Sequence, residues 1–393
     1  MDALSGPPRA ADPGAGHRRP AAPGGRGELR VCYVTPTYFA PESYVGGGER
    51  FAEELARAMA RRAAVKLVSF GGRARRERVG PTLERVILAS WSRDKMVPFS
   101  PWLRRELRGA DVVHCHQYFV LPTFLAACFG HRQGSRVFVS DLGGGALTPG
   151  FHFDQSRWIT AHLPISEYAA RALPGRARPH HVIYCGVDPE LYPMRAAAAH
   201  DGSAAFLGRI LPHKGIHHLI PGLPPGMTLH VIGPALDQDY LDHLRHLAAG
   251  KDVHFHHELT DAEVVAILQR AMALVHPTPV DAAGSAGANE LFGIAPLEAM
   301  ACGCPVIASR AASLPEIVEH ERSGLLVPPN DPAAIGAALT RMATEPELWT
   351  RLSAAARRRV EERFTWDHVA ERCLAAYQAG AGAGERAAGE AAE

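Results

Sequence analysis

Short apolar runs, separated by polar and helical stretches, recur along the whole chain. In the first half, runs with the length and apolar content of buried strands lie at residues 29–35, 65–70, 112–116, 137–140 and 181–184. After the first run, Phe51, Leu55 and Met59 recur at helical spacing, which predicts an amphipathic helix over residues 49–62. Strands that alternate with helices form a parallel sheet with helices on both faces.

The same alternation starts again after residue 203. New strand-like runs lie at residues 204–207, 228–232, 253–256, 273–276, 305–308 and 324–327. The stretch between the two series, residues 193–203, is rich in small residues and poor in apolar ones, as is typical of a linker. The pattern predicts two consecutive doubly wound α/β domains, with ligands bound between them at the carboxyl ends of the strands.

The limits of these units follow from where the pattern begins and ends. We place the first domain at residues 28–195, the second at 200–363, and a closing amphipathic helix at 364–378. Residues 1–27 and 379–393 are dominated by small and charged residues, so both ends are expected to be unstructured. The N-terminal stretch also lacks the apolar segment of a signal peptide.

Composition narrows the class of protein. The 393 residues are 47% hydrophobic and 21% charged, which is typical of a globular enzyme of two or three domains. A net charge of +1 gives no reason to expect a nucleic-acid partner. The longest apolar stretch, residues 119–130, is too short for a transmembrane segment and contains Pro122. Seven cysteines without framework spacing favour reduced thiols and a cytoplasmic protein. The oligomeric state stays open.

The most informative motif is ELFGIAPLEAMACGCPVIAS at residues 290–309. Glu290 and Glu298 stand eight positions apart, around a glycine turn and a helix predicted over residues 296–302. The helix dipole and the unpaired amides of the turn make an anion site there, through Phe292, Gly293 and Ile294. Carboxylates on either side of a bound diphosphate can accept hydrogen bonds from sugar hydroxyls.

This arrangement predicts a nucleotide-sugar site, with Glu290 on the sugar and Glu298 on the ribose. A second motif, GRILPHKG at residues 208–215, places Arg209 and Lys214 five positions apart after a predicted strand. Two fixed cations can bind one diphosphate and stabilise the charge that builds on it when it leaves, without a metal. The alternative for the first motif is a buried strand and helix with two solvated glutamates, and the alternative for the second is a surface loop with two solvated cations.

Both motifs resemble the donor site of the retaining glycosyltransferases of family 4, in the Glu-x7-Glu spacing and in the G-R-x4-K-G segment. That family has the GT-B fold, in which two Rossmann-like domains are followed by a C-terminal helix that crosses back to the first domain. The resemblance covers roughly residues 29–378. It implies a nucleoside-diphosphate sugar as co-substrate, no cofactor, and no metal. It also implies retention by same-face attack, in which the departing phosphate takes the acceptor proton.

Further residues receive a role through this resemblance. Gly47 and Gly48 match the Gly-Gly loop of the first domain, near the donor. His116 ends the segment DVVHCH and matches a histidine that touches the donor sugar. His257 and Leu259 follow a predicted strand and match the residues that line the base pocket. We therefore expect all of them to contribute to donor binding, and His116, Arg209, Lys214 and Glu290 to take part in catalysis.

The acceptor side departs from the family pattern. In the second glycine run, SDLGGGA at residues 140–146, Ser140 and Asp141 replace the His-Asp pair of many members. Asp141 and Gly143 are the candidate acceptor-binding residues. Asp141 can accept a hydrogen bond from an acceptor hydroxyl, pair with an acceptor ammonium group, or cap a turn.

Metal sites are the rival interpretation of several clusters, and none has ligand spacing. His114 and His116 lack a further Cys or His partner at suitable distance in the sequence. The histidines at 254, 256 and 257 do not share one face of a strand, and the Asp-Gln-Asp at 237–239 fits the start of a helix.

The sequence therefore predicts a retaining hexosyltransferase that acts on an acceptor hydroxyl, for example on a natural product such as an aminocyclitol antibiotic intermediate. A lipid-linked or polysaccharide acceptor is an alternative. Two rival classes are a phosphorylase of the same fold and a catalytically silent module that binds sugar nucleotides. The phosphorylase would need a Schiff-base lysine, and no lysine stands in a recognisable cofactor motif.

Overall fold

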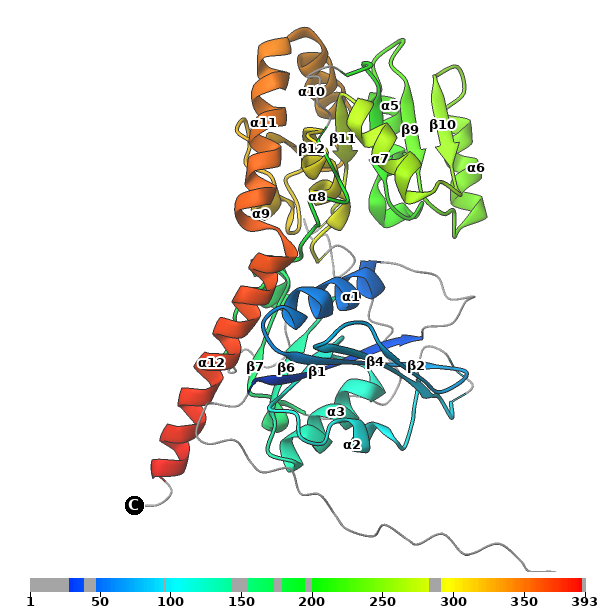
Figure 1. The fold of residues 1–393 in the computed structure, drawn as a ribbon. Coiled ribbons are helices and arrows are strands. Elements are labelled where there is room, and N and C mark those ends of the chain that lie inside the picture. The colour runs from blue at the N-terminus through cyan, green and yellow to red at the C-terminus, as the bar shows by residue number, and fades with distance from the viewer. Residues whose placement is uncertain are drawn as a thin grey trace, which may run out of the picture.

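The computed structural model describes residues 28–38, 47–92, 94, 97–142, 155–172, 179–194, 200–282 and 291–390. They form two α/β domains, followed by a long helix that returns along the first domain (Figure 1). The predicted GT-B architecture, with two Rossmann-like sheets, is confirmed.

The first domain is built on a seven-stranded sheet in the order β3-β4-β2-β1-β5-β6-β7. Neighbouring strands are parallel except for the edge pair β3 and β4. The strands are β1 (Arg30–Tyr38), β2 (Ala64–Gly71), β3 (Arg75–Arg78), β4 (Leu83–Ala89), β5 (Val112–His116), β6 (Arg136–Ser140) and β7 (Ala161–His162). The helices are α1 (Gly47–Ala60), α2 (Leu103–Glu106), α3 (Leu121–Arg132), the short η1 (Ser156–Trp158) and α4 (Glu167–Ala172). Figure 1 shows α1 on the side of this sheet that is turned toward the second domain, and α2 and α3 on the other side.

The second domain contains a six-stranded, fully parallel sheet in the order β10-β9-β8-β11-β12-β13. Its strands are β8 (Ala204–Leu207), β9 (Leu229–Ile232), β10 (Val253–His256), β11 (Ala273–His276), β12 (Val306–Ser309) and β13 (Gly324–Val327). Its helices are η2 (Pro212–Lys214), α5 (Ile216–Gly222), α6 (Gln238–Leu247), α7 (Asp261–Arg270), α8 (Ile294–Ala301), α9 (Leu314–Ile317), α10 (Pro332–Thr344) and α11 (Pro346–Arg363).

The first sheet differs from the prediction at its two edges. The edge strand β3 and its neighbour β4 were not predicted, because charged residues interrupt the apolar pattern in both. Ion pairs across the two strands, such as Arg76 with Glu84 at 2.7 Å, join them instead of apolar contacts. Residues 181–184 do not form the predicted strand, and only an isolated bridge between His162 and His180 lies nearby.

The last helix, α12 (Trp366–Glu390), crosses from the second domain to the first (Figure 1). Its Asp367 pairs with Arg61 of α1 at 2.9 Å, and the Tyr377 hydroxyl is 2.8 Å from Nδ1 of His114 in β5. The prediction that it ends at residue 378 is wrong, because the Ala-rich sequence continues the helix to Glu390. Gly380 permits this course, since a Cβ there would lie 3.0 Å from a Thr160 methyl group. Residues 1–27 and 391–393 lie outside the described residues.

Aromatic side chains join the two domains at the base of α12. Tyr184 of the first domain contacts Phe292 and Phe364 with ring centroids 6.1 and 5.6 Å apart. Phe51 of α1 meets Trp366 edge-on at 5.6 Å. Aromatic pairs of this kind add ring packing to the junction between the two domains.

Candidate functional site

The turn before α8 is held by hydroxyls from both domains. Ser166 of the first domain donates to the Leu291 carbonyl at 2.6 Å, and Ser313 donates to the Phe292 carbonyl at 2.7 Å. Gly293 follows with φ of 94°, a backbone conformation that favours glycine, and caps the helix. These contacts fix the direction of the first amides of α8.

The helix starts at Ile294, two residues earlier than predicted. Its first turn therefore offers the amides of Ile294 and Ala295, whereas Pro296 has no N–H to offer. The Phe292 side chain is 2% exposed and belongs to the aromatic junction between the domains. The predicted anion site therefore depends on backbone groups, because the Phe292 ring is buried in the junction between the domains.

Glu298, the fifth residue of α8, is only 8% exposed. Its Oε1 accepts a hydrogen bond from the Tyr192 hydroxyl at 2.7 Å and lies 3.3 Å from Nη1 of Arg50. Burial raises the pKa of this carboxyl, and hydrogen bonding to Tyr192 and the charge of Arg50 oppose the rise. Glu298 is therefore a buried, hydrogen-bonded carboxyl group between the domains and not a solvated side chain. Glu290 lies outside the described residues.

Arg209 and Lys214 lie on the loop after β8, at the centre of the second sheet. Arg209 is exposed, and Lys214 ends the short helix η2. The next residue, Gly215, has φ of 73°, and a Cβ there would lie 1.9 Å from the Pro277 carbonyl oxygen, so only glycine fits. Because β8 and β11 are neighbours, this close approach places the loop of both cations beside Pro277, the residue that follows β11.

The predicted base-side residues follow β10, which is an edge strand. His257 Nδ1 is 3.1 Å from the Gly233 carbonyl oxygen, so the loops after β9 and β10 are joined. Leu259 is partly buried against the apolar core. A capping box between Thr260 and Glu263 then starts α7. His257 and Leu259 therefore lie at the carboxyl ends of the strands of the second sheet, as Arg209 and Lys214 do.

The first domain contributes two glycines and a polar strand end. Gly47 and Gly48 are the first two residues of α1, where backbone amides are not engaged within the helix. A Cβ on Gly48 would lie 3.9 Å from Leu142, so the start of α1 adjoins the segment after β6. Asp141 lies in that segment and is half-buried. Gly143 lies outside the described residues.

His116, at the end of β5, is fully buried, and neither ring nitrogen has a hydrogen-bond partner among the described residues. Its ring packs against those of Tyr33 and Phe51, with centroids 5.4 and 5.2 Å away. Burial lowers the pKa of His116 to about 3, so the ring is neutral at ordinary pH. In this arrangement the ring is closed off from solvent, and contact with a donor sugar requires its neighbours to move.

His114 projects to the same side of β5, as the alternation of the strand predicts, and its ring is 5.1 Å from that of His116. Its nitrogens are each 2.8 Å from the hydroxyls of Tyr377 and Ser140. His114 therefore connects α12 to the first sheet. Among the described residues, no group of three or more His, Cys, Asp or Glu is arranged to hold a metal ion.

Three residues near Glu298 were missed by the sequence analysis. Arg50 of α1 reaches Asp261, the first residue of α7, at 2.8 Å, in addition to the Tyr192 hydroxyl and Glu298 at 3.3 Å each. None of the three was assigned to the site, although Asp261 follows the predicted base-side residues His257 and Leu259 closely in the sequence. For Arg50, the only available signal was that it follows the glycine run by two positions.

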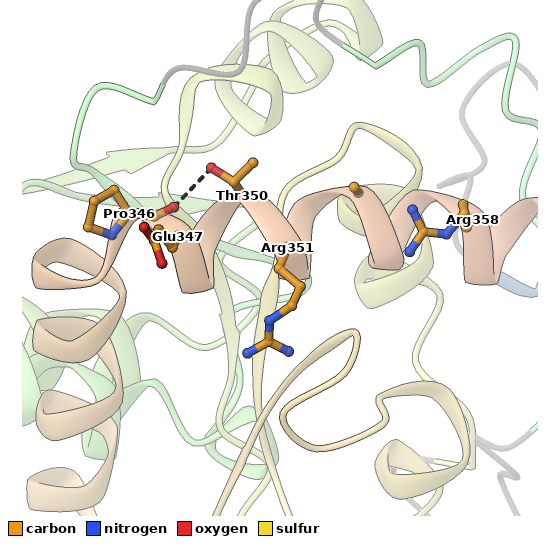
Figure 2. A pocket seen from close by; sticks show the side chains of 6 residues that line it. Pro346, Glu347, Thr350, Arg351 and Arg358 are labelled. Atoms are coloured by element: carbon orange, nitrogen blue, oxygen red, sulfur yellow. Dashed lines mark hydrogen bonds between the residues drawn. The ribbon is translucent and has the colours of Figure 1, made fainter.

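A shallow hollow also lies along α11, on the second domain (Figure 2). It is lined by Pro346, Glu347, Thr350, Arg351, Ala354 and Arg358. Figure 2 shows Thr350 bonded to the carbonyl of Pro346, at 2.9 Å, within the same helix. None of its lining residues comes from the strand ends that carry the motifs, so we do not assign function to it.

In the part of the chain that the structure describes, no helix is long and apolar enough to cross a membrane.

Known glycosyltransferases resemble the chain in both sequence and fold. The sequence model of Glycosyltransferase Family 4 matches residues 45–191, and that of Glycosyl transferases group 1 matches residues 197–359. The chain is 31% identical over 302 residues to a glycogen synthase of Mycobacterium tuberculosis, over 70% of each chain. It is 34% identical over 183 residues to a D-inositol 3-phosphate glycosyltransferase of Jonesia denitrificans, over 44% of this chain and 42% of that protein. HepE of Anabaena, in a complex with UDP-glucose, shares the fold with a TM-score of 0.66 and 18% identity, over 90% of this chain and all of the other.

Proposed function

The chain belongs to glycosyltransferase family 4, and we propose that it transfers a hexose-type sugar from a nucleoside-diphosphate sugar to an acceptor hydroxyl with retained configuration. That it is a glycosyltransferase of GT-B type follows from its family and fold. One observation carries the finer proposal. The loop of Arg209 and Lys214 lies beside Pro277, at the carboxyl end of β11, and the next helix along the chain is α8, whose first turn offers amides and whose second turn carries Glu298.

Each of these groups suits one part of the donor. The Ile294 and Ala295 amides and the two cations bind the diphosphate, because both supply positive charge. Glu298 lies one turn further inside the helix and binds a ribose hydroxyl. Glu290 is assigned to the sugar, on the other side of the diphosphate.

The reaction needs no protein nucleophile in this proposal. The acceptor oxygen bonds to the anomeric carbon on the face from which the diphosphate departs, and the bond from that carbon to the phosphate oxygen breaks. The acceptor proton passes to the departing phosphate oxygen. Arg209 and Lys214 stabilise the charge that builds there, so no metal or cofactor is required. His116 is assigned to the sugar and not to proton transfer, because it is neutral and buried.

For the acceptor, we propose a small hydroxylated molecule such as an aminocyclitol. Asp141, which follows β6, is assigned to accept a hydrogen bond from an acceptor hydroxyl or to pair with an acceptor ammonium group. The relative named for D-inositol 3-phosphate supports a cyclitol, since inositol is one. The glycogen synthase relative favours a second candidate, a glucan chain. The structure of HepE with UDP-glucose makes UDP-glucose the first donor to test. We further propose a cytoplasmic protein, in keeping with its free thiols.

The test starts from the donor. Nucleoside diphosphates are screened by thermal unfolding, since a ligand at a hundred times its dissociation constant adds about 2.7 kcal/mol to stability. A sugar donor that carries the nucleoside diphosphate found to bind, such as a UDP-hexose, is then mixed with cyclitol and glucan acceptors. The release of nucleoside diphosphate is measured. NMR of the product gives the anomeric configuration. A phosphorylase or a silent binding module would release no nucleoside diphosphate, and an inverted product would contradict retention.

A further inference from the structure

One guanidinium group joins the two domains at the proposed donor site. Arg50 is carried by α1 of the first domain, while Glu298 and Asp261 start from α8 and α7 of the second. Tyr192, in the segment that leaves the first domain, accepts a hydrogen bond from Arg50 and donates one to Glu298. The contact is therefore made only when α1 lies against the second domain.

The contacts on Glu298 are one-sided. Both Tyr192 and Arg50 reach the same carboxylate oxygen, Oε1. The proposed ribose hydroxyl is therefore assigned to Oε2, so that the carboxylate can be held from one side and bind from the other. A carboxylate 8% exposed also needs a partner to stay charged, because burial without compensation favours its neutral form.

We propose that Arg50 is a positioning residue of the donor site, which keeps the Glu298 carboxylate charged and oriented for the ribose only while the two domains are closed. This inference rests on the proposed function, in which Glu298 binds the ribose. It makes nucleotide binding and domain closure favour each other, because losing the contact with α1 removes the cation that Glu298 needs.

The second contact of Arg50 extends this coupling to the base. Asp261 is the first residue of α7, and it follows the loop of His257 and Leu259. Arg50 thus contacts both Glu298, which is assigned to the ribose, and the helix that follows the base-side loop. We therefore expect this one side chain of the first domain to affect the binding of both the ribose and the base.

The charged and titratable groups around Glu298 set the sign of the expected pH effect. They are Arg50 of α1, Tyr192, Asp261 of α7 and Cys302 at the end of α8. Burial raises the pKa of Glu298, hydrogen bonding to Tyr192 and the charge of Arg50 lower it, and Asp261 raises it. Removal of Arg50 must raise the pKa of Glu298 further. Nucleotide affinity, which needs the carboxylate, should then begin to fall at a higher pH as the solution is acidified.

The experiment measures UDP affinity by calorimetry between about pH 5 and 8.5 for the full chain and three variants, with GDP, ADP and dTDP as alternative probes. In Arg50→Gln we expect affinity at neutral pH to fall about tenfold or more, as for the loss of a charged partner. We also expect the acid limb of the profile to move to higher pH. Arg50→Lys restores a charge and should return the limb toward its original position.

Glu316→Gln is the matched control. Glu316 also joins the domains, since it accepts the backbone amides of Glu167 and Tyr168 at 2.8 Å each, but it does not contact Glu298. We expect this variant to leave the pH limb unchanged. An equal shift in Glu316→Gln would mean that domain contact in general, and not Arg50, controls the site, and would overturn the inference.

Failure of the two proposals can be told apart. If the wild type binds UDP or another probe and Arg50→Gln binds it equally well over the same pH range, the inference alone is wrong. If the wild type binds none of the probes, the proposed function is wrong and the inference falls with it. Should Arg50→Gln not fold, Arg50→Lys decides. Its single ammonium group cannot replace the two guanidinium nitrogens that reach three partners, so it should weaken binding, while its charge should keep the acid limb near its original position.

Discussion

Replacing Glu298 by glutamine tests the division of the donor between the two glutamates. The amide oxygen of glutamine can still accept the hydrogen bond of the Tyr192 hydroxyl, and Arg50 keeps its 2.8 Å contact with Asp261. The fold around α8 should therefore survive the change. What is lost is the negative charge that the ribose hydroxyls would meet.

A hydrogen bond to a charged group contributes about 1.5–3 kcal/mol, which corresponds to a factor of about 10 to 150 in the dissociation constant. Because the ribose is present in both ligands, Glu298→Gln should weaken the nucleoside diphosphate and the intact nucleotide-sugar by a similar factor. Glu290→Gln is the matched comparison. It should leave nucleoside diphosphate binding nearly unchanged and reduce affinity for the intact donor, or turnover.

Calorimetry with both ligands on both variants measures the four affinities directly, and thermal unfolding checks that each variant is folded. Equal weakening of the bare nucleoside diphosphate by the two substitutions would refute the reasoning. So would a Glu298→Gln variant that binds the nucleoside diphosphate as tightly as the wild type does.

The remaining predictions concern the leaving group, the absence of a metal and the crossing helix. Lys214→Ala should lower turnover by about 100-fold or more through loss of a transition-state cation, and normal turnover in the folded variant would end the diphosphate assignment. Activity should persist in EDTA, and loss that magnesium or manganese reverses would disprove the metal-free mechanism. Tyr377→Phe should cost about 1–3 kcal/mol of stability, because buried His114 loses its 2.8 Å partner; an unchanged denaturation midpoint would contradict this.

Where a strand is buried on both faces, the sequence was sufficient to locate it. The predicted strands at 204–207 and 273–276 coincide with the central strands β8 and β11. Central strands of a parallel sheet read as continuous apolar runs, which need no knowledge of the partner strand. β3 was missed for the opposite reason. Its residues, RRER, carry charges that become stable only beside Glu84 and Glu106 on other elements.

The same distinction applies to the candidate site. Spacing within one segment placed Glu298 inside a helix and the two cations on a single loop, since these relations depend only on local geometry. The predicted start of α8 was two residues too late. The turn at Gly293 is held by hydrogen bonds from the hydroxyls of Ser166 and Ser313, which lie in distant segments of the sequence.

The sequence by itself determined the family, the two-domain architecture and the residues of the two motifs, because all of these are written in short, contiguous patterns. Only the tertiary structure showed that His116 is buried. It also showed that the cation beside Glu298 is Arg50, which lies 248 positions earlier in the chain. A charge that bridges two domains follows no local periodicity. Its partner is set by how α1 and α8 pack once both domains have formed, and that packing is a property of the whole chain.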